Sequence, residues 1–197
     1  MEFIAHQINT IEELKGVPKV YGVEVDLRDY GDRLILQHDP FKDGEDFEEY
    51  LKHYNHGTII LNIKSERIEI WVLDLLIKYK VKDYFFLDCS FPMIYLLSEQ
   101  GEKNIALRFS EFEGLDTIFN MEGKAKWVWV DCFTRLSLDK KSFDQLKNSG
   151  FKLCLVSPDL LARVDDIAEY QSYMKINNIF FDAVCVKSKN ITQWLLK

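Results

Sequence analysis

The sequence predicts an α/β fold, a single compact (β/α)8 TIM barrel that takes up residues 1–197. Eight short apolar segments with the character of strands are each followed by a segment with helical periodicity. No linker, low-complexity run or change in composition divides the chain, so one domain is expected. The chain is shorter than the roughly 250 residues typical of this barrel, and several helices must therefore be short. An open, doubly wound sheet has the same alternation, and periodicity alone does not separate the two folds.

The predicted strands are short runs rich in β-branched, aromatic and other apolar residues. Turn residues or helix-start signals follow most of them, which is typical of strands that feed helices. In chain order they are Phe3–His6, Gly22–Leu27, Thr58–Ile63, Tyr84–Asp88, Ile105–Phe109, Trp127–Asp131, Lys152–Val156 and Ala183–Val186.

Capping residues and stop signals define the predicted helices between these strands. Thr10 and Glu13 match a capping box, and Gly16 marks the end of the short helix that they begin. Ser65 is expected to cap a long helix over Glu66–Tyr79. The other predicted helices are Asp46–Tyr54, Pro92–Glu99, Gly114–Met121, Asp139–Asn148, Pro158–Met174 and a short closing turn over Thr192–Leu196.

One stretch near the N-terminus, Tyr21–Pro40, combines two acidic residues with a histidine. Glu24 and Asp26 stand two apart in a predicted strand, which puts both carboxylates on one face of it. A turn and a second apolar run then return the chain to His38. Buried carboxylates need a cation or strong donors, so the pattern suits metal-assisted acid–base chemistry. An edge hairpin with a solvated acidic face is the structural alternative.

Other predicted strands also carry polar residues on one face, close to their carboxyl ends. The opposite faces stay mostly apolar, which is typical of a barrel whose outer faces pack on helices and whose rim holds a polar site. These residues are His6, Asn62, Lys64, Asp88, Ser90, Arg108, Ser110, Trp129 and Asp131. Of these, Arg108, Trp129 and Asp131 are candidate substrate contacts, with a barrel-filling layer and a buried ion pair as the alternative.

Composition excludes several classes of protein. The net charge of −7 argues against a general binder of nucleic acid or of anionic membranes. No apolar run approaches the length needed to span a bilayer, and no signal-peptide pattern is present, so a cytoplasmic location is expected. The four cysteines include no C-x-x-C pair and lie in or beside apolar runs. They are therefore expected to be buried free thiols, rather than disulfides or zinc ligands.

Four short motifs, taken together, resemble a known family of enzymes. In order they are Ile4–Ala5–His6, Val23–Glu24–Val25–Asp26, Gln37–His38–Asp39–Pro40 and Asn62–Ile63–Lys64. The combination is similar to the glycerophosphodiester phosphodiesterases, which share their barrel with the phosphatidylinositol-specific phospholipases C. Ser90–Phe91 is also similar to a short serine–phenylalanine motif of that family. The chain thus looks like a short, divergent member, and its specific motifs lie within residues 4–64.

The resemblance implies metal-assisted hydrolysis of a small phosphodiester at the carboxyl-terminal mouth of the barrel. His6 and His38 match the paired histidines that act as general acid and base. Glu24 and Asp26 match carboxylate ligands of a divalent cation, magnesium or calcium, and Asn62 takes the place of a third ligand. Lys64 matches a lysine that faces the phosphate, although a salt bridge with Glu24 or Asp26 is the alternative role. These roles come from the resemblance alone.

The sequence also departs from the family pattern. Gln7 stands where the family has an arginine, which removes a bidentate phosphate donor. Asn62 stands where it has a glutamate, so the cation should bind weakly. The large insertion after the second strand is missing, and so is the tryptophan–threonine motif, where Leu155–Ser157 stands. Two alternatives to hydrolysis follow: a non-catalytic barrel that binds a phosphorylated sugar, a glycerol ligand or a protein partner, and a lyase that forms a cyclic phosphate.

Overall fold

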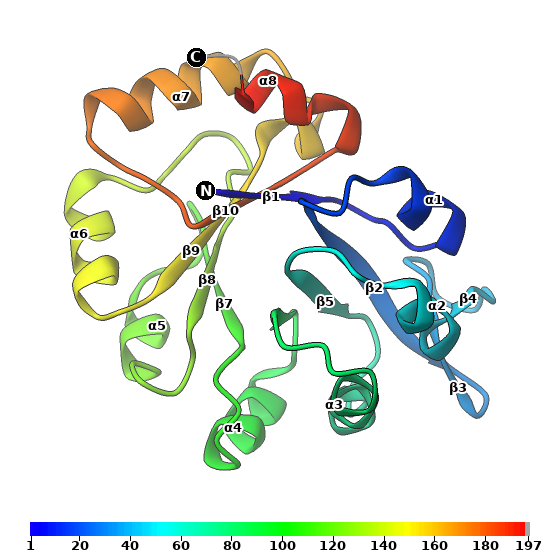
Figure 1. Ribbon diagram of the computed structural model, residues 1–197. Helices are drawn as coiled ribbons and strands as arrows, with labels where there is room; N and C mark the ends of the chain where they lie inside the picture. The colour runs from blue at the N-terminus through cyan, green and yellow to red at the C-terminus, as the bar shows by residue number, and fades with distance from the viewer. Residues whose placement is uncertain (196–197) are drawn as a thin grey trace.

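The computed structural model describes residues 1–195, in which eight parallel strands curl around a common interior (Figure 1). Each of these strands coincides with a predicted one to within a few residues. In chain order they are β1 (Glu2–Ala5), β2 (Gly22–Tyr30), β5 (Ile59–Ile63), β6 (Tyr84–Leu87), β7 (Ala106–Phe109), β8 (Trp127–Val130), β9 (Lys152–Val156) and β10 (Ala183–Val186). Their carboxyl ends lie at one end of the sheet, which we call the mouth.

Parallel ladders join these strands in the order β6-β5-β2-β1-β10-β9-β8-β7. Between β6 and β7 there is one isolated bridge, Phe86 to Ile105, with a hydrogen bond of 2.8 Å from the Phe86 N–H to the Asn104 carbonyl. The prediction of a fully closed barrel is therefore wrong at this β6–β7 seam. The curled arrangement is that of a TIM-like barrel with one weakly paired junction.

The seam has a local cause in the backbone at the end of β6. Asp88 adopts φ 62°, a left-handed conformation that ends the extended strand and its pairing. Beyond the last backbone bridge, side chains connect the two strands: Arg108 of β7 donates two hydrogen bonds to Asp88. The Nε–Oδ1 and Nη2–Oδ2 distances are 2.7 and 2.9 Å, so an ion pair joins the strand ends at the mouth.

The second strand continues beyond the barrel as a hairpin. Leu27–Tyr30 of β2 pair antiparallel with β3 (Arg33–Leu36), which in turn pairs with β4 (Glu45–Asp46). A hydrogen bond of 2.8 Å from the Gln37 N–H to the Asp26 carbonyl then returns the chain to the mouth. The loop that carries His38 is thereby placed beside the end of the parallel part of β2.

Helices form a ring outside the strands (Figure 1). Thr10 and Glu13 form the predicted capping box at the start of α1. The helices are α1 (Ile11–Gly16), α2 (Phe47–His53), α3 (Glu69–Lys78), α4 (Phe91–Glu99), α5 (Asp116–Asn120), α6 (Lys140–Asn148), α7 (Asp166–Ile176) and α8 (Ile191–Leu195), with 3-10 turns η1 (Pro158–Leu161) and η2 (Ser188–Asn190).

Two predicted helices differ from the structure, each because a residue takes a left-handed backbone. Ser65 does not cap α3, which begins at Glu69 after Arg67 at φ 69°. The helix predicted over Pro158–Met174 is split into η1 and α7 by Ala162 at φ 60°. The last residue of the turn predicted over 192–196 lies outside the described residues.

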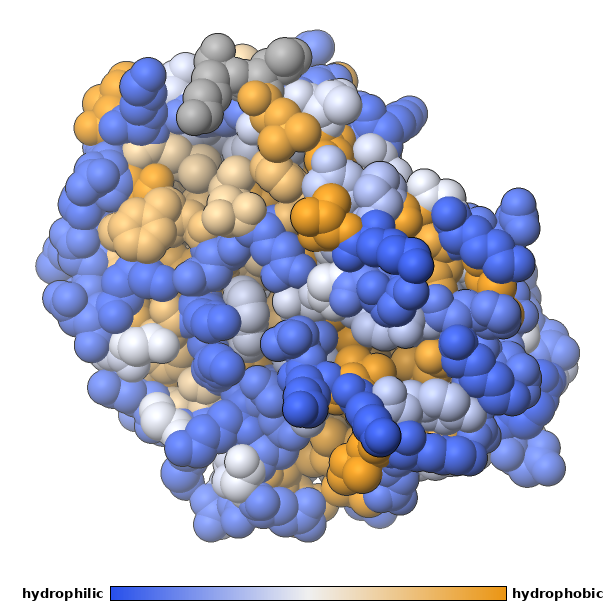
Figure 2. All heavy atoms as spheres, in the orientation of Figure 1, coloured by the Kyte–Doolittle hydropathy of each residue, from blue (hydrophilic) through white to orange (hydrophobic). Residues whose placement is uncertain are grey.

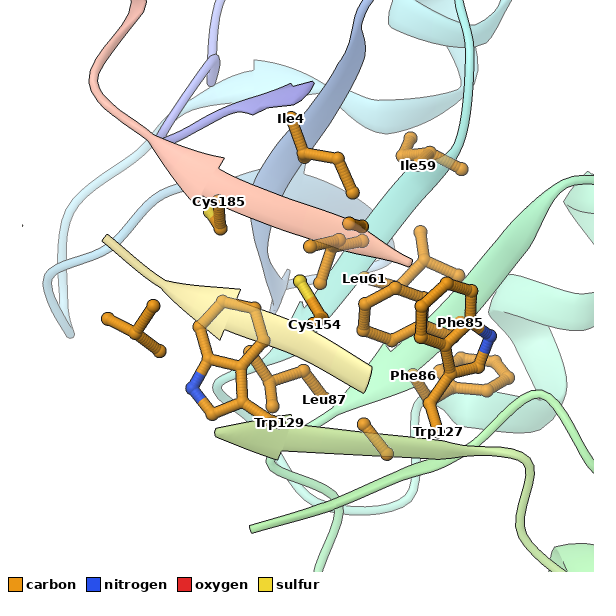
Figure 3. Close-up of a cluster of buried hydrophobic side chains, with 14 of the residues drawn as sticks. Ile4, Ile59, Leu61, Phe85, Phe86, Leu87, Trp127, Trp129, Cys154 and Cys185 are labelled. Atoms are coloured by element: carbon orange, nitrogen blue, oxygen red, sulfur yellow. The ribbon is translucent and has the colours of Figure 1, made fainter. Parts of the chain in front are cut away.

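The interior is filled by aliphatic, aromatic and cysteine side chains (Figure 3). Phe85 and Trp127 stack with ring centroids 4.5 Å apart, and all four cysteines are free and buried, as predicted. Register places Asp26, Asn62 and Leu87 at one level of neighbouring strands, so they share a face. The face predicted for this strand, which was that of Asp88 and Ser90, is therefore wrong: Phe85 and Leu87 lie on the side of Glu24 and Asp26.

The face of the molecule in Figure 2 is mostly hydrophilic, with apolar side chains in separate patches between charged ones. Within residues 1–195, none of the helices combines the length and the apolar character needed to cross a membrane.

Candidate active site

Two buried carboxylates lie at the mouth, on the inner face of β2. Glu24 is 1% exposed and Asp26 is 0% exposed, so the alternative of a solvated hairpin face is wrong. The β2–β5 register sets Asp26 beside Asn62. Two carboxylates at this depth require strong donors or a cation.

Glu24 accepts hydrogen bonds from β5 and from the loop that follows β1. Asn62 Nδ2 donates to Oε1 at 2.8 Å, and the Gln7 N–H donates to Oε2 at 2.7 Å. Gln7 takes a left-handed backbone with φ 54° immediately after His6. Burial, reinforced by the neighbouring Asp26 carboxylate, nevertheless raises the pKa of Glu24 to about 7.

His6 lies against Glu24, with Nε2 3.8 Å from Oε2. Burial lowers the pKa of the His6 imidazole to about 4, although the charge of Asp26 acts in the opposite direction. The ring is therefore neutral at pH 7, and at so low a pKa it is a weak base. Its backbone N–H donates to the Val186 carbonyl at 3.0 Å, which fixes His6 at the end of the β1–β10 ladder.

Asp26 is held by a residue that sequence reasoning missed. Asn9 Nδ2 donates to Asp26 Oδ2, and the Asp26 N–H donates to Asn9 Oδ1, both at 2.8 Å. Lys64 Nζ lies 3.4 Å from Asp26 Oδ1, so the salt bridge considered for this lysine is present. Nothing in the sequence marks Asn9 as part of the site, since it lies in a loop and joins Asp26 only through the fold.

His38 lies at the mouth through its backbone, but its ring is not part of the buried network. Arg28 donates from Nη2 to the His38 carbonyl at 2.8 Å and from Nη1 to the Lys64 carbonyl at 3.1 Å. The His38 side chain is 55% exposed, and its Nδ1 lies 3.1 Å from Asp39 Oδ1. Within residues 1–195, no hydrogen bond or ion pair joins the His38 ring to His6.

Arg108, a candidate substrate contact, is engaged by carboxylates of the protein. Besides Asp88, its guanidinium pairs with Asp131, which also accepts a hydrogen bond of 3.2 Å from Trp129 Nε1. Burial raises the pKa of Asp131 to about 6 despite the opposing effect of Arg108. Lys64 Nζ lies 3.9 Å from Asp88 Oδ2 and connects this network to Asp26. The geometry is that of the alternative role, a largely buried ion-pair network.

A third group of polar residues at the mouth was also missed in the sequence. Asp159 of η1 is 2% exposed and accepts from Asn190 Nδ2 at 2.7 Å and from the Lys187 N–H at 3.2 Å. The β1–β10 register continues to His6 and Lys187, and the charges of Lys187 and Asp159 act in opposite directions on the pKa of His6. The sequence signal for them was their position within four residues of the ends of the predicted strands that correspond to β9 and β10.

The oxygens around Asp26 fit a hard divalent cation by their chemistry. Within residues 1–195, the buried atoms Asp26 Oδ1 and Asn62 Oδ1 accept no hydrogen bond, although the Lys64 ammonium forms an ion pair with Asp26 Oδ1. Carboxylate and amide oxygens are the ligands that magnesium and calcium prefer. Among the described residues there is no group of three or more His, Cys, Asp or Glu side chains placed to hold a metal ion. The set of oxygen atoms that could bind a metal ion is therefore small, and the Lys64 ammonium lies beside it.

No family model matches the sequence, and no curated protein matches it. Solved structures do share its fold. A glycerophosphodiester phosphodiesterase from Agrobacterium tumefaciens matches with a TM-score of 0.69 and 14% identity, over 96% of this chain and 98% of that one. A provisionally named glycerophosphoryl diester phosphodiesterase from the same organism matches with a TM-score of 0.69 and 12% identity, over 99% and 97%. At these identities the likeness is one of fold.

Proposed function

We propose that this chain is a divergent glycerophosphodiester phosphodiesterase that hydrolyses a small phosphodiester at the mouth. The observation that carries the proposal is the buried Glu24–Asp26–Asn62 group beside His6. It occurs in a fold shared with structures that carry this enzyme name. A buried acidic group beside an uncharged imidazole suits a cation-dependent proton transfer.

In the proposed reaction, His6 removes a proton from water while the water oxygen forms a bond to phosphorus. The bond from phosphorus to the leaving oxygen breaks, and protonated His38 supplies the proton that makes the departing group an alcohol. Lys64 offers a positive charge at the rim. Glu24, Asp26 and Asn62 would hold a magnesium or calcium ion, which neutralises phosphate charge when bound.

A second candidate is a non-catalytic barrel that binds a phosphorylated ligand. The position of His38 favours it, because the ring is exposed and pairs with Asp39. Hydrolysis requires the loop that carries His38 to bring this ring to the phosphodiester, since a general acid must reach the leaving oxygen. The two candidate functions therefore differ in whether the His38 ring is required for activity.

The deciding experiment is an assay of the purified protein on glycerophosphodiesters and on an aryl phosphodiester, with magnesium or calcium. We expect alcohol release that His38→Ala abolishes without a change in melting temperature. His53→Ala is the matched control, because it removes an exposed histidine at the end of α2. No turnover on the whole panel, together with metal-independent binding of a phosphorylated ligand, would establish the binding protein instead.

A further inference from the structure

The partly buried cations at the mouth differ in whether a protein group already satisfies them. Lys64 lies within 3.4 Å of Asp26, and Arg108 pairs with Asp88 and Asp131. Lys187 is also partly buried, but its ammonium has no hydrogen-bond or ion-pair partner within residues 1–195. An ammonium that no protein group pairs with is free to bind an anion that enters the mouth.

Strand register places Lys187 beside His6. In the parallel β1–β10 ladder Ile4 lies opposite Cys185 and Ala5 opposite Val186, so the next pair is His6 and Lys187. Paired residues on neighbouring strands share a face. The extended backbone of Lys187 (φ −61°, ψ 132°) continues the alternation of β10. Its charge also contributes to the lowered pKa of His6, which supports the same placement.

The backbone around Lys187 is anchored. The Lys187 N–H donates to Asp159 Oδ2 at 3.2 Å, and Asn190 Nδ2 donates to the same oxygen at 2.7 Å. Trp194 Nε1 donates to Ser157 Oγ at 2.9 Å and ties α8 to the start of η1. The buried carboxylate thus holds the peptide of Lys187 rather than its ammonium. The backbone of Lys187 is therefore fixed, while its ammonium group remains available to a ligand.

We propose that Lys187 binds the phosphate group of the substrate from the β10 side of the mouth. The inference deepens the proposed function, on which it rests for the identity of the anion. Gln7, the residue after His6, carries no charge, whereas Lys187 carries a positive charge beside His6 on the neighbouring strand end. An ammonium paired with phosphate forms charge-assisted hydrogen bonds, which are stronger than neutral ones.

The test is calorimetric titration of inorganic phosphate, with magnesium at a fixed concentration, into wild type and variants. Lys187→Met should weaken phosphate binding about tenfold or more, because one charge-assisted contact is lost. Lys187→Arg should retain most of the affinity. Lys189→Met is the matched control, since it removes an exposed lysine two residues away, and it should bind like wild type. Equal affinity of Lys187→Met and wild type, or no binding to wild type, would overturn the inference.

A measurement on the unaltered chain covers the case in which Lys187→Met does not fold. Nuclear magnetic resonance of the isotope-labelled lysine side chains should show phosphate shifting the Lys187 signal and leaving Lys189 unmoved. The reverse pattern would overturn the inference. Phosphodiester turnover is measured separately on the same samples. If phosphate binding depends on Lys187 but nothing is hydrolysed, the inference stands and the proposed hydrolysis fails.

Discussion

At the scale of single residues, Glu24 and His6 show how burial sets proton affinity in opposite directions. Burial disfavours the charged form of each group, so it raises the pKa of the acid to about 7 and lowers that of the base to about 4. A neutral imidazole then lies 3.8 Å from a carboxyl group that titrates near neutrality. The charge state of the site is therefore sensitive to pH and to a bound cation.

Glu24→Gln should change how stability depends on pH. Because the pKa of Glu24 is raised in the folded state, its protonated form stabilises the fold relative to the unfolded chain. This stabilisation is fully present below about pH 4.5 and is lost as pH rises through 7. The glutamine variant lacks this loss, so it should gain stability relative to wild type between pH 4.5 and 8. The gain should be on the order of 1–3 kcal/mol. Urea unfolding of both proteins with chelator measures it, and a pH-independent difference would contradict the expected burial effect.

Asn62→Glu should strengthen metal binding. With two charged ligands we expect wild type to bind magnesium and calcium weakly, on the order of 10⁻⁴–10⁻³ M, because charge count governs affinity. The variant adds a third carboxylate but loses the amide donor to Glu24, so without metal it should melt at a lower temperature. Added metal should restore the melting temperature.

Calorimetric metal titration and thermal melts measure both effects of Asn62→Glu. The control is Asn120→Glu, which adds the same charge at an exposed position in α5. Micromolar binding to wild type, or no change on Asn62→Glu, would show that Asn62 is not a metal ligand.

At the scale of elements, side-chain ion pairs connect β6 and β7, which share little backbone hydrogen bonding. A single bridge joins the two strands, and Arg108 then links their ends through Asp88 and extends the link to Asp131 on β8. This role explains why an arginine and two carboxylates occupy strand ends without requiring them to bind substrate.

Arg108→Met should destabilise the protein by on the order of 3 kcal/mol, because the carboxylates would lose their shared cation. Adding Asp88→Asn and Asp131→Asn to this variant should recover part of the loss. Lys124→Met, which breaks the exposed pair with Glu99, is the control and should cost less than about 1 kcal/mol. Urea unfolding distinguishes these outcomes, and a loss as small as that of the control would mean that Arg108 is not structural.

At the scale of the whole molecule, the curled sheet is unevenly connected. Ladders of several residue pairs join β2 to β5 and β8 to β9, whereas β6 and β7 share one bridge. A sheet opens most easily where the fewest hydrogen bonds must break. This sheet should therefore open first at the β6–β7 seam.

Hydrogen exchange should reveal this opening as weak protection at the seam. The Phe86 amide, which forms the hydrogen bond at the bridge, should exchange faster than the Val25 amide in the middle of the β2–β5 ladder. Arg108→Met should raise exchange at Phe86 and leave Val25 unchanged. Equal protection of the two amides in wild type would contradict a weak seam.

The sequence by itself determined the strands, the α1 capping box and the face shared by Glu24 and Asp26. These features follow from local periodicity and short-range hydrogen bonding, which a sequence displays directly. Burial of the four cysteines was predictable for the same reason, because their neighbours are apolar.

Only the tertiary structure decided how distant segments meet. The left-handed backbone of Asp88, the pairing of Arg108 with carboxylates of the protein and the outward ring of His38 depend on neighbours that the sequence does not place. Lys187 lies beside His6 because the first and last strands of the sheet pair with each other. Contacts between residues far apart in the chain are fixed by packing and strand order, and local sequence patterns carry no record of them.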